Sequence, residues 1–283
     1  MNIKEIRKKL RPIKKLYLKL IFLLSNFIFF FIPNFILDNA FERKIYCKFK
    51  DIRFSIRNFS KVCRFRAKTF SYKEPDTLNW IDSFDAESSF IDIGANVGIY
   101  SLYASYKLKN IYAFEPDALN FSLLNLNIFD NKKDKIIKAY PISIHSYDTY
   151  NSLNIKKYIW GGALSSFENK FDQFQNEFIP EIEQGSYSMS LDQIVKNLKI
   201  KNKTIHCKID VDGNENEILK GATKTLSEKI FQSILIELDT NRTDYRETLK
   251  YFDDNGYVLK SINSSPVYKN IFGSTKNHIF YAE

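Results

Sequence analysis

Hydrophobic and polar residues change their pattern near residue 88, where short apolar runs begin to alternate with segments of helical periodicity. The run 89–93 is compact and apolar, as is typical of a buried parallel strand. The pattern predicts further strands at 110–114, 135–139, 204–211, 231–238, 257–262 and 278–282, and helices at 97–108, 117–129 and 243–255. Strands that alternate with helices indicate an α/β fold with a doubly wound, mostly parallel sheet. Such sheets bind ligands at the carboxyl ends of their strands.

A different pattern occupies the first 40 residues. Apolar residues recur every three or four positions between Ile3 and Leu20, and basic residues fill most of the gaps, which predicts a helix starting near Pro12. Residues 20–37, 18 in number, carry no charge and are at the lower limit for crossing a bilayer. We favour a pair of helices on the membrane surface, because basic residues flank the run on both sides. A spanning helix and an extension packed on the core are the alternatives.

The net charge of +9 is unevenly distributed along the chain. Residues 1–73 contain 19 Lys and Arg against 4 Asp and Glu, whereas residues 74–283 contain 23 against 29. An acidic body is poorly suited to nucleic acid, so no nucleic-acid partner is expected. We therefore divide the chain into a basic and apolar segment at 1–40 that binds an anionic membrane surface, a basic extension at 41–87, and the functional domain at 88–283.

The cysteines bear on the compartment in which the protein works. Cys47, Cys63 and Cys207 lie far apart and match no zinc-binding spacing. A disulfide scaffold is therefore excluded, and a reducing compartment is expected. Together with the basic segment, this predicts a cytoplasmic protein that is peripheral on the inner face of the cytoplasmic membrane.

The first candidate site is the glycine turn after the strand at 89–93. Asp92 offers a carboxylate at the strand tip, and Gly94 and Gly98 let a ligand approach the backbone. Asn96 occupies the position of the second glycine in a dinucleotide-binding turn, so the usual pyrophosphate-binding site is not formed. Glu115 follows the next strand, where an acid can accept hydrogen bonds from both ribose hydroxyls. The turn predicts a nucleoside-type cofactor rather than a dinucleotide.

The second candidate site follows the strand predicted at 204–211. Lys208 and Asp210 lie on one face of that strand by alternation, and Asp212 and Glu215 come directly after it. Charges are costly to bury on a central strand, but they are tolerated at its open carboxyl end. The alternatives are a catalytic pair and a structural ion pair, with Asp212 or Glu215 at the N-terminus of the next helix.

Three segments together resemble the FkbM-type family of S-adenosylmethionine methyltransferases. They are DIGANVGIYS at 92–101, AFEP at 113–116 and KIDVDGNENEILKGA at 208–222, and WGGALSS at 160–166 and SLDQIV at 190–195 are looser matches. The resemblance covers roughly residues 88–282. It implies a seven-stranded Rossmann-like fold, S-adenosyl-L-methionine as cofactor, and O-methylation of a sugar in a surface glycan or of a secondary metabolite. Asp212 stands where the family usually has Glu, which shortens the side chain by one methylene.

The resemblance turns the two candidate sites into a cofactor site and a catalytic site. Asp210 is the predicted base, Lys208 holds it or stabilises charge on the acceptor oxygen, and Trp160 either stacks on a sugar or anchors its loop. The cofactor residues are Asp92, Gly94, Asn96, Gly98 and Glu115, the catalytic residues are Asp210, Lys208, Asp212 and Glu215, and no metal ligand is assigned.

Two rival functions remain open from the sequence alone. Asp210-Val211-Asp212 also fits the DxD motif of a metal-dependent glycosyltransferase, although that motif does not explain Glu115. The other rival is a non-catalytic cofactor-binding module at the membrane, against which the intact Lys208 and Asp210 argue. The expected acceptor is a small molecule or glycan.

Overall fold

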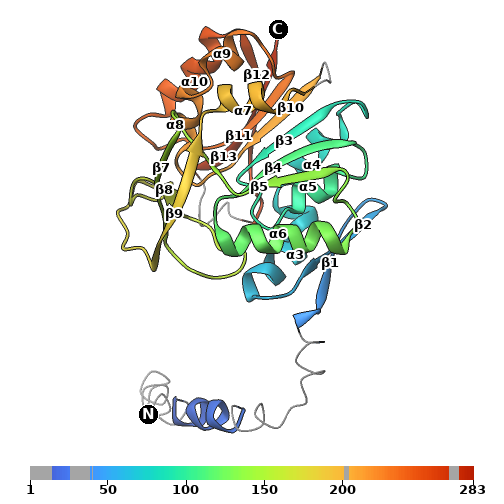
Figure 1. Cartoon of the computed structure of the whole chain (residues 1–283), viewed down its shortest axis with the longest axis vertical. Helices are drawn as coiled ribbons and strands as arrows, with labels where there is room; N and C mark the ends of the chain where they lie inside the picture. The colour runs from blue at the N-terminus through green and yellow to red at the C-terminus, as the bar shows by residue number, and fades with distance from the viewer. Residues whose placement is uncertain (1–14, 26–38, 40, 201–203, 268–273) are drawn as a thin grey trace, which may run out of the picture. The chain divides into compact units, whose positions relative to one another are not determined.

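The computed structural model describes residues 15–25, 39, 41–200, 204–267 and 274–283 of the 283-residue chain (Figure 1). The chain forms two units, residues 1–43 and residues 44–283. In the first unit, residues 15–25 are helical, within the region where a helix was predicted. Residues 26–37 of the uncharged run lie outside the described residues. No helix in the described ranges is both long enough and apolar enough to cross a membrane.

A seven-stranded sheet forms the centre of the second unit, in the order β12-β13-β11-β10-β3-β4-β5. All neighbours are parallel except for β13, which runs antiparallel to β11 and β12. Each predicted strand is present, which confirms the doubly wound, mostly parallel fold. The strands are β3 Ser89–Ile93, β4 Asn110–Phe114, β5 Ile137–Tyr140, β10 Ile205–Ile209, β11 Ser233–Asp239, β12 Tyr257–Ser264 and β13 Thr275–Ala282.

Helices cover both faces of this sheet and enclose two hydrophobic cores. One core joins Phe90 and Leu235 to the helices from α3 to α6, and the other joins Ile91 and Ile236 to those from α7 to α10. Asp117 caps α6 as predicted, since its Oδ1 accepts hydrogen bonds from the N–H groups of Leu119 and Asn120 at 2.8 and 3.1 Å. These helices are α5 Ile99–Ala104, α6 Ala118–Asp130, α7 Leu191–Leu198, α8 Glu215–Lys220, α9 Thr223–Ser227 and α10 Tyr245–Asp254.

Residues 44–87 belong to the same compact unit as the sheet, although the sequence suggested a separate extension before residue 88. They form the hairpin β1 Lys44–Phe49 and β2 Ile52–Arg57, followed by α3 Lys61–Lys73 and α4 Pro75–Asp82. Helix α4 is tied to the sheet, because the indole N–H of Trp80 donates to Ser233 Oγ at 2.9 Å. The segment is therefore one wall of the core.

A second, four-stranded sheet lies between β5 and β10 in the chain, in a stretch for which no strands were predicted. Its order is β6-β9-β7-β8. Its strands are β6 Ser143–Ile144, β7 Thr149–Ile155, β8 Ser166–Phe167 and β9 Ile182–Met189. Figure 1 shows β7, β8 and β9 grouped beside the main sheet rather than continuing it.

Candidate functional site

The glycine turn joins β3 to α5, and its two glycines are required by the packing of the chain itself. Gly94 and Gly98 have φ values of +79° and +84°, which residues other than glycine rarely adopt. A Cβ on Gly94 would overlap the carbonyl oxygen of Asp210, and a Cβ on Gly98 would overlap Leu124. The turn is therefore pressed against β10 and α6, which is a different reason for these glycines from the ligand approach that the sequence suggested.

Asp92 lies beneath the turn rather than at its open side. Its side chain is 1% exposed, and Oδ2 accepts a 2.6 Å hydrogen bond from Ser101. Burial raises the pKa of this carboxyl, although the neighbouring Lys208 charge lowers it. Neither Asp92 nor Gly98 lines either of the two cavities described below. Both residues help to hold the turn, and their direct contact with the cofactor stays a prediction.

Two cavities meet at the carboxyl ends of β3 and β10. We call them the Glu115 cavity and the Glu237 cavity, with volumes of about 80 and 250 Å³. Gly94, Asn96, Ala163, Asp210 and Asp212 line both of them. The predicted cofactor turn and the predicted catalytic residues therefore come together at one place in the fold.

Glu115 is held at the floor of the Glu115 cavity by two backbone donors. Its Oε2 accepts from the N–H of Asn96 at 2.7 Å, and its Oε1 accepts from the N–H of Asp117 at 2.9 Å. Burial, with the nearby Asp117 charge, raises the pKa of Glu115 to about 8. Each carboxylate oxygen keeps a lone pair for a further donor. Apolar side chains complete the cavity: Ile93, Phe114, Ile142, Ile144, Leu153 and Phe167.

The loop at 160–164 contributes residues to both cavities. Asn96 Nδ2 donates to the carbonyl of Gly162 at 2.6 Å, and Asn120 Oδ1 accepts from the N–H of Gly161 at 2.8 Å. Trp160 packs edge-on against Phe59 at 5.1 Å and lines neither cavity. Its side chain is a hydrophobic anchor, which is one of the two roles expected for it, and stacking on a sugar stays a prediction.

Lys208 and Asp210 form an ion pair at the end of β10. Lys208 is 1% exposed, and its Nζ donates to Asp210 Oδ2 at 2.6 Å. Burial alone would lower the pKa of Lys208, but the charges of Asp210, Asp92 and Glu74 outweigh it and raise that pKa. The ammonium also lies 5.0 Å from the centre of the Tyr100 ring. The side chain of Asp210 is 23% exposed and lines both cavities.

Asp212 and Glu215 shape the loop after β10. Asp212 adopts φ +61°, and its Oδ2 accepts from the N–H of Leu164 at 2.6 Å. Burial and the Asp210 charge raise the pKa of Asp212 to about 6. Glu215 begins α8, and its Oε1 accepts from the N–H of Gly213 at 3.1 Å. It lines neither cavity and supports the loop after β10, so its catalytic role stays a prediction.

Several residues of the Glu237 cavity were not foreseen from the sequence. Arg66, Lys73 and Glu74 come from the segment before residue 88, for which the sequence predicts a basic extension and no site. Lys73 forms an ion pair with Glu74, and the hydroxyl of Tyr100 donates to Glu74 Oε2 at 2.7 Å. The other residues missed come from the C-terminal strands and nearby loops: Gln173, Ser265, Thr275, Lys276 and Asn277.

A family model described as "Methyltransferase FkbM domain" matches residues 92–259. This match spans more than half of the chain. It contains the glycine turn, Glu115, the ion pair of Lys208 and Asp210, and strand β11. The chain belongs to the FkbM methyltransferase family. It is also 24% identical over 190 residues to Methyltransferase 1 of Beauveria bassiana (strain ARSEF 2860), which covers 62% of this chain and 74% of that protein.

Solved structures with a similar arrangement include two methyltransferases of low sequence identity to this FkbM protein. Magnesium protoporphyrin IX methyltransferase from Synechocystis PCC 6803, with bound SAM, is 8% identical over 80% of this chain and 86% of its own, with a TM-score of 0.46. A putative rRNA methylase from Clostridium thermocellum is 7% identical over 74% and 95%, with a TM-score of 0.45.

S-adenosylmethionine is the cofactor of this FkbM methyltransferase, and the residues that line the Glu115 cavity suit its nucleoside part. A buried carboxylate with free lone pairs suits the ribose hydroxyls, and the apolar walls suit the adenine ring. When bound, the cofactor supplies a methyl group on a positively charged sulfur. Glu115 and Asn96 would hold it, and Gly94 lines the cavity beside them.

The DxD interpretation is not retained. The two carboxylates have different hydrogen-bond donors. Asp210 accepts from Lys208, and Asp212 accepts from the N–H of Leu164. Within the described ranges, no three His, Cys, Asp or Glu side chains are grouped closely enough to hold a metal ion. Membership of the FkbM methyltransferase family assigns methyl transfer to this site instead of glycosyl transfer.

Gly94→Ala is expected to lower the free energy of unfolding by about 2–4 kcal/mol, because the methyl group overlaps a backbone carbonyl and φ is positive. Thermal denaturation measures this loss. Gly185→Ala on β9 is the matched control, since nothing lies within 4 Å of its Cβ position, and its effect should stay below about 1 kcal/mol. Equal melting temperatures for the two variants would refute the close approach of the turn to β10.

Binding of S-adenosylhomocysteine should strengthen as pH rises through about 8, because only the ionised Glu115 accepts freely from the ribose hydroxyls. The expected change approaches roughly tenfold per pH unit below that value. Glu115→Gln should bind more weakly at pH 9, by about 2–3 kcal/mol, and should lose the pH dependence. Calorimetry measures both effects, and methylthioadenosine serves as a probe without an amino-acid group. A pH profile shared by both proteins would show that Glu115 does not contact the ribose.

Proposed function

We propose that the protein is an O-methyltransferase whose acceptor is a hydroxyl of a sugar in a surface glycan or of a secondary metabolite. The observation that carries this proposal is the position of Asp210. Its carboxylate lines the cofactor-binding Glu115 cavity and also the adjoining Glu237 cavity. A base at such a junction is placed to take a proton from an acceptor in the second cavity.

The proton transfer follows from the surroundings of Asp210. In the described part of the chain, its hydrogen bond comes from Lys208 to Oδ2, and the side chain remains partly exposed to the cavities. As the acceptor oxygen forms its bond to the methyl carbon, the bond from that carbon to sulfur breaks, and the acceptor's proton passes to Asp210. Lys208 fixes the carboxylate and stabilises negative charge on it before the proton arrives.

The lining of the Glu237 cavity supports a polar, hydroxyl-bearing acceptor. Its side chains are predominantly charged or amide groups, and four of them are acids: Glu74, Asp210, Asp212 and Glu237. Acids accept hydrogen bonds from hydroxyl donors, and amide side chains both donate and accept. A non-catalytic module is disfavoured, because such a protein has no need to keep an ion pair at this junction.

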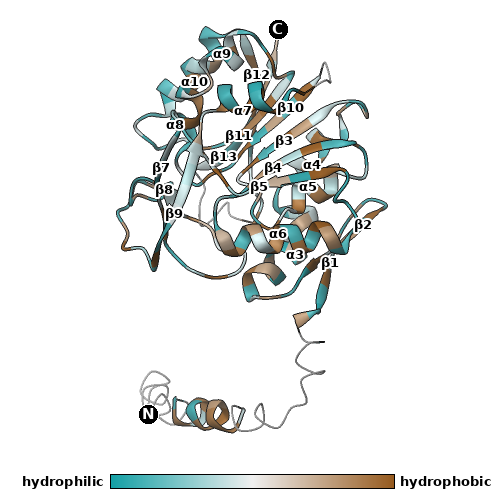
Figure 2. Ribbon diagram, in the orientation of Figure 1, coloured by the Kyte–Doolittle hydropathy of each residue, from teal (hydrophilic) through white to brown (hydrophobic). Residues whose placement is uncertain are grey.

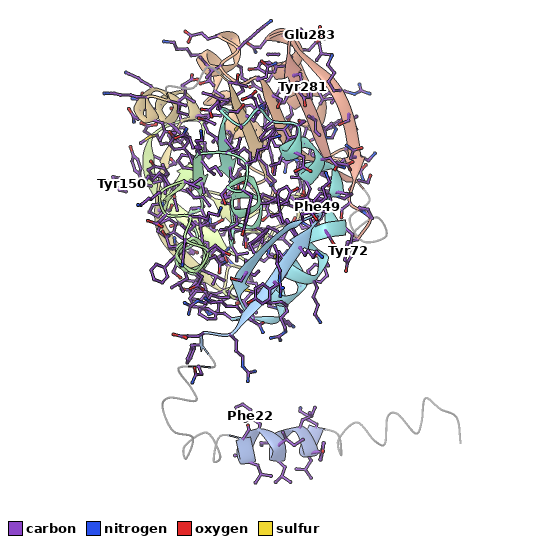
Figure 3. All side chains as sticks on the ribbon, turned by 90° about the vertical axis from the view of Figure 1, so that its right-hand side faces the viewer. Phe22, Phe49, Tyr72, Tyr150, Tyr281 and Glu283 are labelled. Carbon is purple, nitrogen blue, oxygen red and sulfur yellow. The ribbon has the colours of Figure 1, made fainter. Side chains whose placement is uncertain are left out.

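Attachment to an anionic membrane is the second part of the proposal. The helix at 15–25 exposes most of its large apolar side chains, with Leu16 70% and Phe22 63% exposed. Figure 2 shows that this helix is largely hydrophobic, whereas α9 and α10 are largely hydrophilic. Figure 3 labels Phe22 on this helix. In the catalytic unit, α3 exposes a basic and aromatic stripe, at spacings of three or four residues: Lys61, Arg64, Phe65, Lys68 and Tyr72. Such surfaces suit a peripheral position on the cytoplasmic membrane.

Asp210→Asn is expected to reduce turnover by about 10²–10⁴-fold, because it keeps the shape of the side chain and removes the base. The melting temperature and the affinity for S-adenosylhomocysteine should stay near those of the wild type. Lys208→Met should also reduce turnover, and the double variant should lose less than the combined single losses, since the groups act together. Turnover that falls only in step with the melting temperature would favour a purely structural ion pair.

Removal of residues 1–38 should release the protein from anionic vesicles, because the apolar helix and the basic residues of the 1–40 segment are lost. High salt should weaken binding of the full-length chain only in part, since the apolar contribution does not depend on charge. Flotation with phosphatidylglycerol and phosphatidylcholine vesicles measures both effects.

A charge-reversal pair tests α3 separately. Lys61→Glu, Arg64→Glu and Lys68→Glu together should reduce flotation. The triple change of Lys132, Lys135 and Lys138 to Glu alters the net charge equally at another exposed site and should have little effect. If the truncated protein floats as well as the full-length protein, residues 1–38 do not attach the protein to the membrane. If alkaline carbonate fails to extract the full-length protein, a spanning helix is favoured.

A further inference from the structure

A row of polar side chains crosses the carboxyl edge of the sheet, on the face that carries Lys208. In β10 and β11, Lys208 pairs with Leu235 and Ile209 with Ile236, so the next step of the same register sets Asp210 beside Glu237. In β11 and β13, Glu237 pairs with Asn277. Neighbouring strands lie about 4.8 Å apart, so these three side chains are spaced at that interval. All three line the Glu237 cavity.

This row has hydrogen-bonding capacity that the described residues do not satisfy. Asn277 is 6% exposed, and its Nδ2 donates to Thr77 Oγ1 at 3.2 Å, but its buried Oδ1 accepts from no group in the described part of the chain. Thr275 Oγ1, also in the lining, is likewise buried without a partner there. Such groups are rare in folded proteins unless a ligand or water completes them.

Glu237 faces the same space. Within the described ranges its carboxyl makes no side-chain hydrogen bond, and its surroundings act on it through charge. Burial raises the pKa of Glu237 well above its usual range, the charges of Asp210 and Glu74 raise it further, and Lys73 opposes them. A neutral carboxyl both donates and accepts, and so does a hydroxyl group. The two groups are therefore complementary.

We propose that the acceptor is a vicinal diol, with the reacting hydroxyl at Asp210 and the adjacent hydroxyl at Glu237, so that Glu237 determines specificity. This inference rests on the proposed O-methylation. The reacting oxygen forms its bond to the methyl carbon while the bond from carbon to sulfur breaks, and its proton passes to Asp210. Glu237 exchanges hydrogen bonds with the second hydroxyl and undergoes no net change. The product is a monomethyl ether with a free neighbouring hydroxyl.

The order of strands explains why the two carboxyls have different roles. Asp210 follows β10, which adjoins β3 and the cofactor turn, whereas Glu237 lies on β11, one strand further away. Glu237 does not line the Glu115 cavity. Only a hydroxyl at Asp210 can therefore meet the methyl group, and a hydroxyl at Glu237 serves to fix the orientation of the acceptor.

The test measures release of S-adenosylhomocysteine from wild-type protein with methyl α-L-rhamnopyranoside, methyl α-D-mannopyranoside and methyl β-D-galactopyranoside. Each sugar is compared with the analogues that lack one ring hydroxyl, and cyclohexanol is the acceptor with a single hydroxyl. Glu237→Leu removes the hydrogen bonds, Glu237→Gln retains a group that donates and accepts, and Glu247→Leu on α10 is an exposed control.

For a sugar that is converted, deletion of the hydroxyl next to the methylated position should reduce kcat/KM by roughly 10–100-fold. Glu237→Leu should cause a similar loss on the intact diol and no further loss on that deoxy analogue, while Glu237→Gln recovers most of the activity. Affinity for S-adenosylhomocysteine should not change. Glu247→Leu should resemble wild type throughout.

Two other outcomes overturn the inference and are distinguishable from each other. Conversion of cyclohexanol or the deoxy analogues as efficiently as the diols, or an equal effect of Glu237→Leu on both, rejects the diol and leaves O-methylation in place. Failure of the wild type to convert any of these hydroxyl compounds, with S-adenosylhomocysteine still bound, rejects both the diol and the proposed function.

Discussion

A fully buried ammonium group at the end of β10 is the constraint around which the site is built. Lys208 is 1% exposed, and an unpaired charge at that depth would cost several kcal/mol. The fold supplies Asp210 on the same strand, Asp92 at the neighbouring position of β3 and the face of the Tyr100 ring. Tyr100 is in turn hydrogen-bonded to Glu74, at the start of α4. The charge therefore links the glycine turn, the central strand and the segment before residue 88.

Some of the elements joined by this charge can be predicted from the sequence, and others cannot. The seven strands, the capping by Asp117 and the meeting of Gly94, Glu115 and Asp210 follow from local patterns, because the ends of adjacent parallel strands converge. The hairpin of β1 and β2 escaped prediction although its apolar and polar residues alternate. Its outward positions are mostly basic, as Lys44 and Lys48 are, and this masks a strand whose inner face contains Cys47.

The residues of the Glu237 cavity were harder to foresee for a different reason. Arg66 and Lys73 lie on α3, while Lys276 and Asn277 lie on the last strand, some 200 positions later in the chain. Only the antiparallel return of β13 between β11 and β12 brings them together. Individually, Arg66 and Lys73 resemble the other basic residues around them, and no local spacing separates those that line the cavity from those on the surface.

The loop at 160–164 connects the two cavities physically, and this makes their geometries dependent on each other. From one side, Ser60 Oγ and Arg66 Nε donate to the carbonyls of Trp160 and Gly161 at 2.6 and 2.9 Å. From the other side, Asn96 holds Gly162. The backbone N–H of Asn96 also donates to Glu115, so the cofactor turn, the loop and α3 share one chain of hydrogen bonds. The basic segment, which the sequence suggested was an extension, is thus part of the frame around both cavities, because one loop joins α3 to the cofactor turn by hydrogen bonds.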